Sequence, residues 1–355
     1  MPAAVELEHV TKRFGEVMAV DDVSFTVDKN EFFSLLGPSG CGKTTTLRCV
    51  AGLEEPDSGI IKLSGKVVTN VPAHKRNVGL VFQDLALFPH MNVFDNIAFG
   101  LEMKKVSEEE IEKRVKNALE LVGLKGLETR RIHQLSGGQK QRVALCRSLV
   151  PEPDVLLLDE PLGALDLKIR RRMTVELRRI QKEVEKTFIY VTHDQTEAIV
   201  MSDRIAVMQG GKIKQIGESR EIYSHPKDPF IASFIGEAVN TIKGVCEKPG
   251  VFVGKKLEKP VKVEIREELL NIPAVLSIRP ERIRMAKKLR NLDNILNTRI
   301  SSTLFKGMYH EYEVETGSDL MIKVFVPYMG PKTTFQVHDS VQIGWNKEDA
   351  VIIPI

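Results

Sequence analysis

Four short runs of almost wholly apolar residues constrain the fold of this chain more than any other feature of its sequence. They are FFSLLG (32–37), VGLVFQ (78–83), VLLLDE (155–160) and FIYVTH (188–193). A strand without alternating polar residues is buried on both faces, which is typical of a parallel sheet covered by helices. We therefore predict an α/β fold with such a sheet at the centre of residues 1–236.

Polar residues or glycine stand where these runs end. In a parallel sheet the carboxyl ends of the strands lie at one edge, and ligands bind beyond that edge. We therefore expect the residues at the strand ends to share one site. They are Gly37, Gln83, Asp159, Glu160 and His193.

The first run leads into GPSGCGKT (37–44), which matches the pattern G-x-x-x-x-G-K-[ST] between a predicted strand and a predicted helix. In this motif backbone N–H groups cradle nucleotide phosphates, the Lys43 ammonium neutralises the β- and γ-phosphates, and the Thr44 hydroxyl is a ligand of Mg²⁺. The alternative is a glycine-rich turn that binds nothing, which the strand–helix context disfavours. The predicted phosphate cradle consists of Gly37, Pro38, Ser39, Gly40, Cys41, Gly42, Lys43, Thr44 and Thr45.

The run VLLLDE supplies two carboxylates for the same site. Asp159 would hold Mg²⁺, directly or through water, and Glu160 would act on the attacking water as base or positioning group. A carboxylate pair at a strand end could instead cap a helix. However, Pro161 follows at once, and two negative charges beside a phosphate loop are costly without a cation. We therefore interpret both carboxylates as functional.

A second potential phosphate site lies in HQLSGGQKQR (133–142). Ser136, Gly137 and Gly138 precede an apolar-periodic run, so they begin a helix whose free N–H groups and dipole favour an anion. Taken alone, such residues indicate only a helix cap. The local pattern does not explain why one chain has two potential phosphate sites, the loop at 37–44 and the helix start at 136–138.

The string LSGGQKQR, placed just before VLLLDE and downstream of the phosphate loop, resembles the LSGGQ signature of the ATP-binding cassette family. The resemblance extends over about residues 5–240. It implies a homodimer in which two copies pack head to tail. Each ATP would then lie between the phosphate loop of one subunit and Ser136, Gly137, Gly138 and Gln139 of the other. ATP would hold the subunits together, and hydrolysis would let them part.

The same resemblance implies roles for further residues. Phe14 would stack on adenine, with a core phenylalanine at a strand end as the alternative. Gln83 would sense Mg²⁺ and the attacking water, His193 would contact the γ-phosphate, and Asp166 would contact the opposite subunit. The implied catalytic residues are Lys43, Gln83, Glu160 and His193, and the implied Mg²⁺ ligands are Thr44, Gln83 and Asp159.

Residues 84–150 are predicted to form a helical subdomain within the first domain. Its segment 107–123 has a capping box at Ser107 and Glu110 and an apolar stripe that stops at Gly123. The stripe consists of Ile111, Val115, Leu119 and Val122.

Two other segments of the first domain carry predictions. The amphipathic pattern of residues 166–186 predicts a helix whose arginines, Arg170 to Arg172 among them, form a solvated face. Residues 84–100 are rich in apolar and aromatic side chains. They form either subdomain core or a groove for a short helix of a membrane partner, and the family places its permease contact here.

The pattern changes around Pro226 and Pro229, after which short alternating runs and turns predict a small OB-like β-barrel over residues 240–355. The stretches LSIRPERIRM and GWNKEDAVII resemble the accessory barrel of importer ATPases for polyamines, sugars, sulfate and ferric ion. We expect this accessory domain to be regulatory.

Composition limits the function classes. A net charge of +3 is too small to indicate nucleic acid as a partner, and four cysteines without a C-x-x-C pair indicate neither a zinc site nor a disulfide framework, as expected for a reducing cytoplasm. About 18 consecutive apolar residues would be needed to span a membrane, and no such run is present. A transport pore would therefore belong to other chains.

The resemblance thus implies an ATPase that couples ATP and Mg²⁺ to import. Its partners would be a second copy, two transmembrane permease subunits and a solute-binding protein on the outer face. It would lie peripherally on the cytoplasmic face of the inner membrane. The cassette most resembles those of polyamine importers. The alternatives are a sulfate or other oxyanion, ferric ion or sugar importer, and a soluble cassette ATPase that acts on nucleic acid.

Overall fold

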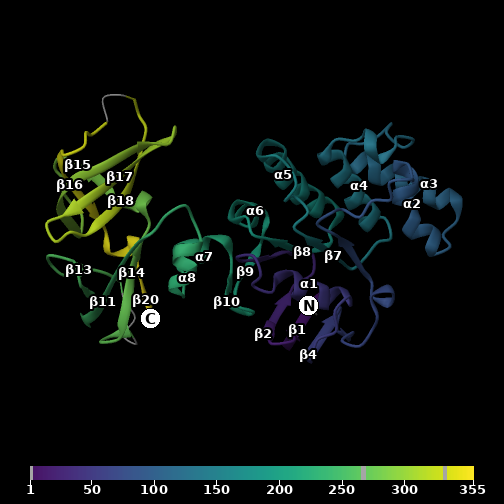
Figure 1. Ribbon diagram of the computed structural model, residues 1–355, viewed down its shortest axis with the longest axis horizontal. Coiled ribbons are helices and arrows are strands. Elements are labelled where there is room, and N and C mark those ends of the chain that lie inside the picture. Colours follow the sequence, from purple (N-terminus) through teal and green to yellow (C-terminus); the bar gives the residue numbers. More distant parts are fainter. Residues whose placement is uncertain (1–2, 265–268, 331–333) are drawn as a thin grey trace. The chain divides into compact units, whose positions relative to one another are not determined.

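The computed structural model describes residues 3–264, 269–330 and 334–355 (Figure 1). The chain divides into two compact units, Met1–Ser219 and Arg220–Ile355. Residues 220–236, which the sequence analysis places with the first domain, are grouped with the second unit by their contacts.

A six-stranded sheet in the order β10-β9-β3-β8-β7-β6 forms the centre of the first unit. All neighbours from β9 to β6 pair in parallel, and β10 alone pairs antiparallel, with β9. The four apolar runs are β3, β6, β7 and β8, so the predicted parallel sheet is confirmed. The bounds are β3 Phe32–Leu36, β6 Val78–Val81, β7 Val155–Asp159, β8 Thr187–Thr192, β9 Arg204–Gln209 and β10 Lys212–Gly217.

The sheet separates two hydrophobic cores, which explains why its strands are apolar throughout. In β7, Leu156 and Leu158 belong to one core, and Val155 and Leu157 belong to the other. The first core is closed by helices that include α5 (Leu167–Val184), and the second by α1 (Lys43–Ala51) and an antiparallel sheet (Figure 1). That second sheet has the order β2-β1-β4-β5, with β1 Val5–Phe14, β2 Val17–Val27, β4 Ser58–Leu63 and β5 Lys66–Val67.

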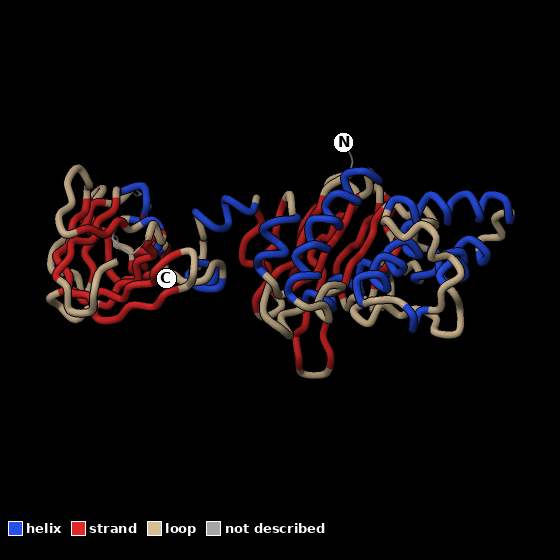
Figure 2. Tube along the Cα trace, turned by 90° about the horizontal axis from the view of Figure 1, so that it is seen from above, coloured by secondary structure: helices blue, strands red, loops and turns tan. Residues whose placement is uncertain are grey.

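A helical insert follows β6, as predicted, and Figure 2 shows it as helix and loop. It contains α2 (Val93–Met103), α3 (Glu108–Leu121) and α4 (Gly137–Leu149). The apolar stripe of α3 is buried, but the predicted capping box is wrong, because the Ser107 hydroxyl caps no N–H. The reason is local: the Glu110 carboxylate accepts a hydrogen bond of 2.6 Å from Arg114 Nε and so pairs within its own helix.

In its described residues the second unit has short helices and two five-stranded antiparallel sheets that share one core. The largest fully buried side chains of that core are Phe252, Tyr312 and Trp345. This β-rich domain confirms the predicted accessory domain. Its elements are α7 Ser219–Ser224, α8 Pro229–Phe234, β11 Asn240–Lys248, β12 Val251–Gly254, β13 Val261–Lys262, β14 Pro273–Ile278, β15 Arg284–Ala286, β16 Asn294–Phe305, β17 Tyr309–Thr316, β18 Met321–Pro327, β19 Ser340–Trp345 and β20 Ala350–Pro354.

Within the described residues no helix is both long and apolar enough to cross a bilayer. The four cysteines are buried free thiols.

Arg279 joins the short helices of the second unit to its sheets. The residue is 6 % exposed, and its guanidinium donates to the carbonyls of Tyr223, Ala232 and Ile235. It also lies 4.4 Å from the centroid of the Tyr223 ring. Removal of the guanidinium would leave several buried carbonyls without a donor, which costs free energy.

We expect Arg279→Met to lower the free energy of unfolding of the second unit by about 1–3 kcal/mol. Trp345 is the single tryptophan of the chain and is buried in this unit, so its fluorescence in a urea titration reports on the unit selectively. The matched control is Arg282→Met, because that arginine is 54 % exposed and pairs with Asp349 at 3.5 Å. Equal urea midpoints for the two variants would contradict the assigned role.

Candidate functional site

The strand-end residues lie at one edge of the parallel sheet. The register aligns Leu36 with Thr192, Asp159 with Val191, and Val81 with Leu158. The residues that follow these positions therefore leave the sheet together. Gly37, Gln83, Asp159, Glu160 and His193 thus end or follow neighbouring strands at this edge, where contacts join Asp159 to Thr44 of the loop and Glu160 to His193.

Two positions of the loop between β3 and α1 require glycine. Gly42 precedes α1 with φ of 104°, and a Cβ atom there would lie 2.1 Å from the Ala19 carbonyl oxygen. A Cβ atom at Gly37 would lie 2.3 Å from the Met208 carbonyl oxygen. The first turn of α1 has no side-chain cap, so its N–H groups are available to an anion.

Lys43 places a positive charge inside this loop. Its ammonium group donates to the carbonyl oxygens of Gly37 at 2.8 Å and Pro38 at 2.9 Å, and it lies 3.8 Å from Cys41 Sγ. The residue is only 4 % exposed, and these three neighbours are neutral. A buried charge among neutral groups is costly, so a phosphate placed here would be strongly stabilised.

Oxygen atoms suited to Mg²⁺ face the same loop. The Thr44 hydroxyl donates a hydrogen bond of 2.9 Å to Asp159 Oδ1, and Asp159 is 6 % exposed. Burial raises the pKa of the Asp159 carboxyl, and the hydrogen bond from Thr44 partly opposes that rise. Mg²⁺ is usually held by one or two carboxylates and by phosphate oxygens of the substrate, so this hydroxyl–carboxylate pair fits the ion. Among the described residues no group of three or more His, Cys, Asp or Glu side chains could hold a metal without such phosphates.

Glu160 and His193 form a pair at the sheet edge. His193 Nδ1 lies 2.9 Å from Glu160 Oε2, and the Glu160 N–H donates to the Val191 carbonyl at 3.1 Å. Glu160 has φ of 44°, a conformation that costs a residue with a side chain about 1–3 kcal/mol and that is often found at active sites. The pair is therefore a carboxylate held in a fixed direction by an imidazole, as a base or a water-positioning group requires.

Phe14 ends β1 and is 46 % exposed, so it does not belong to the buried core. The Lys12 ammonium lies 5.2 Å from the centroid of its ring. The remaining ring surface is available for stacking on a base.

The signature residues begin α4 on the helical insert. Ser136 and Gln139 form a reciprocal capping box, in which Ser136 Oγ accepts from the Gln139 N–H and Gln139 Oε1 accepts from the Ser136 N–H. Ser136 and Gly137 are exposed, whereas Gly138 is buried. Asp166 caps α5 by accepting from the N–H groups of Lys168 and Ile169.

Arg170 differs from the expectation of a solvated face. It donates to the carbonyls of Gly163 at 3.2 Å and Leu165 at 3.0 Å, and it lies 3.6 Å from Asp194 Oδ2. It therefore ties the segment before Asp166 to the segment after His193. A signal existed in the sequence: position 170 precedes the buried Met173 and Leu177 by three and seven residues, on the apolar stripe of the helix.

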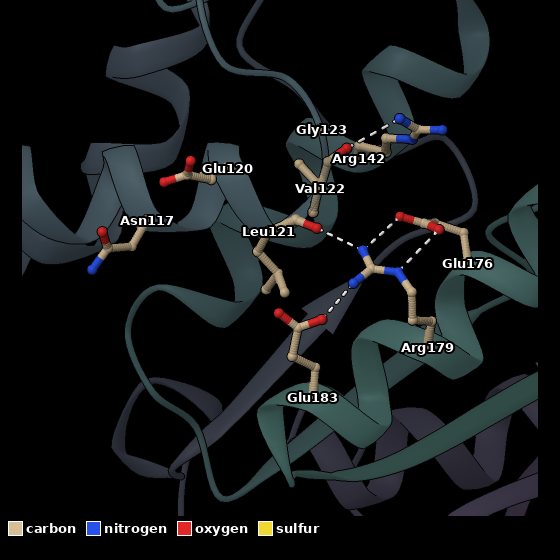
Figure 3. A pocket seen from close by; sticks show the side chains of 9 residues that line it. All are labelled: Asn117, Glu120, Leu121, Val122, Gly123, Arg142, Glu176, Arg179 and Glu183. Atoms are coloured by element: carbon tan, nitrogen blue, oxygen red, sulfur yellow. Dashed lines mark hydrogen bonds and ion pairs between the residues drawn. The ribbon is translucent and has the colours of Figure 1, made fainter.

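A hollow between α3, α4 and α5 holds two further arginines (Figure 3). Arg179 donates to the Leu121 carbonyl at 2.7 Å and to the carboxylates of Glu176 and Glu183. Arg142 donates to the Val122 carbonyl at 3.0 Å. These arginines hold the last carbonyls of α3, so the hollow is a polar joint between the insert and α5.

Comparison with known proteins agrees with this geometry. Residues 20–163 match the family model for the ABC transporter, and residues 276–353 match the model for the TOBE domain. The spermidine/putrescine import ATP-binding protein PotA of Thermobifida fusca (strain YX) is 46 % identical over 99 % of this chain and 94 % of its own length. The protein of the same name from Acidothermus cellulolyticus is 52 % identical over 78 % of this chain and 73 % of its own length.

Two solved structures resemble the first unit. One is cbiO1 from Clostridium perfringens, part of the ABC transporter complex cbiONQ, with a TM-score of 0.59 and 31 % identity over 63 % of this chain and 92 % of that chain. The other is a dimeric post-hydrolysis state of the ATP-binding cassette MJ0796 bound to ADP and Pi. It has a TM-score of 0.55 and 31 % identity over 61 % of this chain and 99 % of that chain.

We expect Lys43→Ala to lower the affinity for MgATP by about tenfold or more, because the substitution removes the buried ammonium from the phosphate loop. Isothermal titration with MgATP measures the effect. Lys66→Ala, at an exposed position of β5, is the matched control. An unchanged affinity in Lys43→Ala would contradict the proposed phosphate cradle.

Proposed function

The chain belongs to the ATP-binding cassette family, and on that premise we propose that it is the ATP-hydrolysing subunit of a polyamine importer, with spermidine and putrescine as the expected cargo. One observation carries the catalytic part of this proposal. The phosphate loop, the Thr44–Asp159 pair and the Glu160–His193 pair occupy one edge of the central sheet. The relatives named for spermidine and putrescine import support the choice of cargo.

In the proposed reaction the loop residues hold ATP by its phosphates. Lys43 and the N–H groups of residues 39–45 neutralise and orient the β- and γ-phosphates. Thr44, Asp159 and Gln83 would hold Mg²⁺, which neutralises charge on the phosphates when it is bound. Glu160 accepts a proton from the attacking water or fixes its direction. His193, which lies 2.9 Å from the Glu160 carboxylate, would contact the γ-phosphate.

The signature residues complete the site from a second copy. Ser136, Gly137, Gly138 and Gln139 begin a helix on the insert, whereas the phosphate loop follows β3 of the central sheet. A head-to-tail dimer would place the exposed α4 N-terminus of one subunit against the γ-phosphate held by the other. The dimeric arrangement of the similar cassette MJ0796 supports this proposal.

Transport requires partners that cross the membrane. We assign two permease subunits and an external solute-binding protein to the complex, with this chain at the cytoplasmic face of the inner membrane. Segment 84–100 is a candidate permease contact, since Leu87, Phe88 and Phe94 are only partly buried. The proposed function includes no nucleic acid partner. The alternatives are an importer for sulfate or another oxyanion, ferric ion or a sugar, and a nucleic-acid ATPase.

The composite site predicts the behaviour of two variants in size-exclusion chromatography with light scattering. Glu160→Gln should lower kcat by about 10²-fold or more, because the proton acceptor is lost, and MgATP should then hold it as a dimer. Adding Ser136→Arg should return this variant to a monomer that still binds MgATP. A double variant that remains dimeric would contradict the role of Ser136, and a Glu160→Gln protein with wild-type turnover would contradict the role of Glu160.

The cargo is tested by uptake in cells whose copy of the gene for this chain is deleted. The wild-type gene should restore uptake of labelled spermidine and leave uptake of labelled sulfate unchanged, whereas the Lys43→Ala gene should restore neither. Restoration of sulfate uptake alone would contradict the polyamine assignment and leave the ATPase assignment intact.

A further inference from the structure

Two consecutive residues just after Gln83 have a left-handed backbone although neither is glycine. Leu85 has φ of 63° and Ala86 has φ of 45°. Each such residue costs about 1–3 kcal/mol and persists only where its surroundings impose it. The turn that follows Gln83 must therefore be held by groups outside it.

Arg147, in the last turn of α4, holds this turn. Its guanidinium donates to the Ala86 carbonyl at 2.6 Å and to the Leu85 carbonyl at 2.8 Å. It also lies 5.5 Å from the centroid of the Phe88 ring. Burial lowers the pKa of Arg147, and the negative charge of Asp84 partly opposes that fall. A guanidinium stays charged in proteins, so this partly buried cation is stabilised by the two carbonyls and by Asp84.

Both ends of the turn are fixed as well. Upstream, the Leu85 N–H donates to the Phe82 carbonyl at 2.9 Å. Downstream, the fully buried Asn96 accepts from the Phe88 N–H at 2.8 Å and donates to the Phe88 carbonyl at 3.1 Å. With both ends fixed, the position of the middle residues is set by Arg147.

The helix that carries Arg147 is also the helix that begins at the signature residues. Helix α4 spans Gly137–Leu149, so Ser136 caps one end and Arg147 lies near the other. Because a helix of this length is stiff, Arg147 links the turn after Gln83 to the signature end of the same subunit.

We propose that Arg147 is a positioning residue, which holds the left-handed turn at Leu85 and Ala86 and so places Gln83 for hydrolysis. The proposal rests on the proposed function, because it takes Gln83 to act on Mg²⁺ and the attacking water. In this proposal Arg147 acts through the backbone of the turn, by its hydrogen bonds to the Ala86 and Leu85 carbonyls.

The experiment compares full-chain variants in steady-state MgATP hydrolysis and in MgATP titration. We expect Arg147→Gln to lower kcat by about 10- to 100-fold, because Gln83 is misplaced, and to change the dissociation constant for MgATP by less than about twofold, because the phosphate loop is intact. Arg147→Lys keeps the positive charge but lacks the planar guanidinium whose two NH2 groups each reach one carbonyl, and it should retain an intermediate kcat. Thermal unfolding of each variant measures stability separately.

A second substitution separates positioning from folding. Glycine adopts the left-handed conformation without strain, so Ala86→Gly should restore at least about threefold of the kcat lost in Arg147→Gln. Arg179→Gln is the matched control, since Arg179 is an arginine of the first unit that also donates to a backbone carbonyl, that of Leu121 at 2.7 Å, but lies outside the proposed site. Its kcat should stay within about twofold of wild type, and Ala86→Gly should not raise it further.

Three outcomes would overturn the proposal. They are a wild-type kcat in Arg147→Gln, an equal loss of kcat in Arg179→Gln, and a loss that Ala86→Gly does not relieve. The proposed function fails in a different way, because the wild-type chain would then not hydrolyse MgATP at all.

Discussion

Parallel pairing of β3, β8, β7 and β6 is the constraint on which the rest of the first unit depends. The segments that follow parallel strands all leave the sheet at the same edge. Parallel pairing alone therefore brings together segments that are far apart in the chain. The Thr44–Asp159 bond joins residues 115 positions apart, and the Glu160–His193 contact joins residues 33 apart. Two hydrophobic cores hold the strands in register, so the residues at the edge of the sheet lie in fixed positions.

Residues with strained backbone conformations lie at the same edge of the sheet. Glu160, Leu85 and Ala86 have positive φ although they carry side chains, and all three follow the end of a central strand by a few residues. Such conformations persist because stiff neighbours impose them. For Glu160 the neighbour is β8, through the Val191 carbonyl, and for the turn at Leu85 and Ala86 it is α4, through Arg147. Hydrogen bonds to β8 and α4 thus stabilise strained backbone conformations at and near the proposed site.

Arginines connect different elements in both units. Arg147, Arg170, Arg142 and Arg279 each donate to backbone carbonyls of another segment. A planar guanidinium presents several donors in a fixed geometry, so one side chain can hold two carbonyls at once. In the cassette these contacts join the insert, the segment before Asp166 and the segment after His193. In the second unit Arg279 does the same for α7 and α8.

The amino-acid sequence by itself determined the parallel sheet, the phosphate loop, the helical insert and the β-rich second domain, because each depends on a local pattern of apolar residues, glycines and caps. It also placed the strand-end residues at one edge, since that follows from parallel pairing. It did not determine the side-chain pairings. Glu110 pairs with Arg114 rather than capping α3, and Arg170 points into the structure rather than to solvent. The hydrogen bond from Arg147 to the Leu85 carbonyl joins residues that are 62 positions apart in the sequence. Only the tertiary structure could decide these contacts, because a charged side chain selects its partner from the groups that folding brings within hydrogen-bond distance.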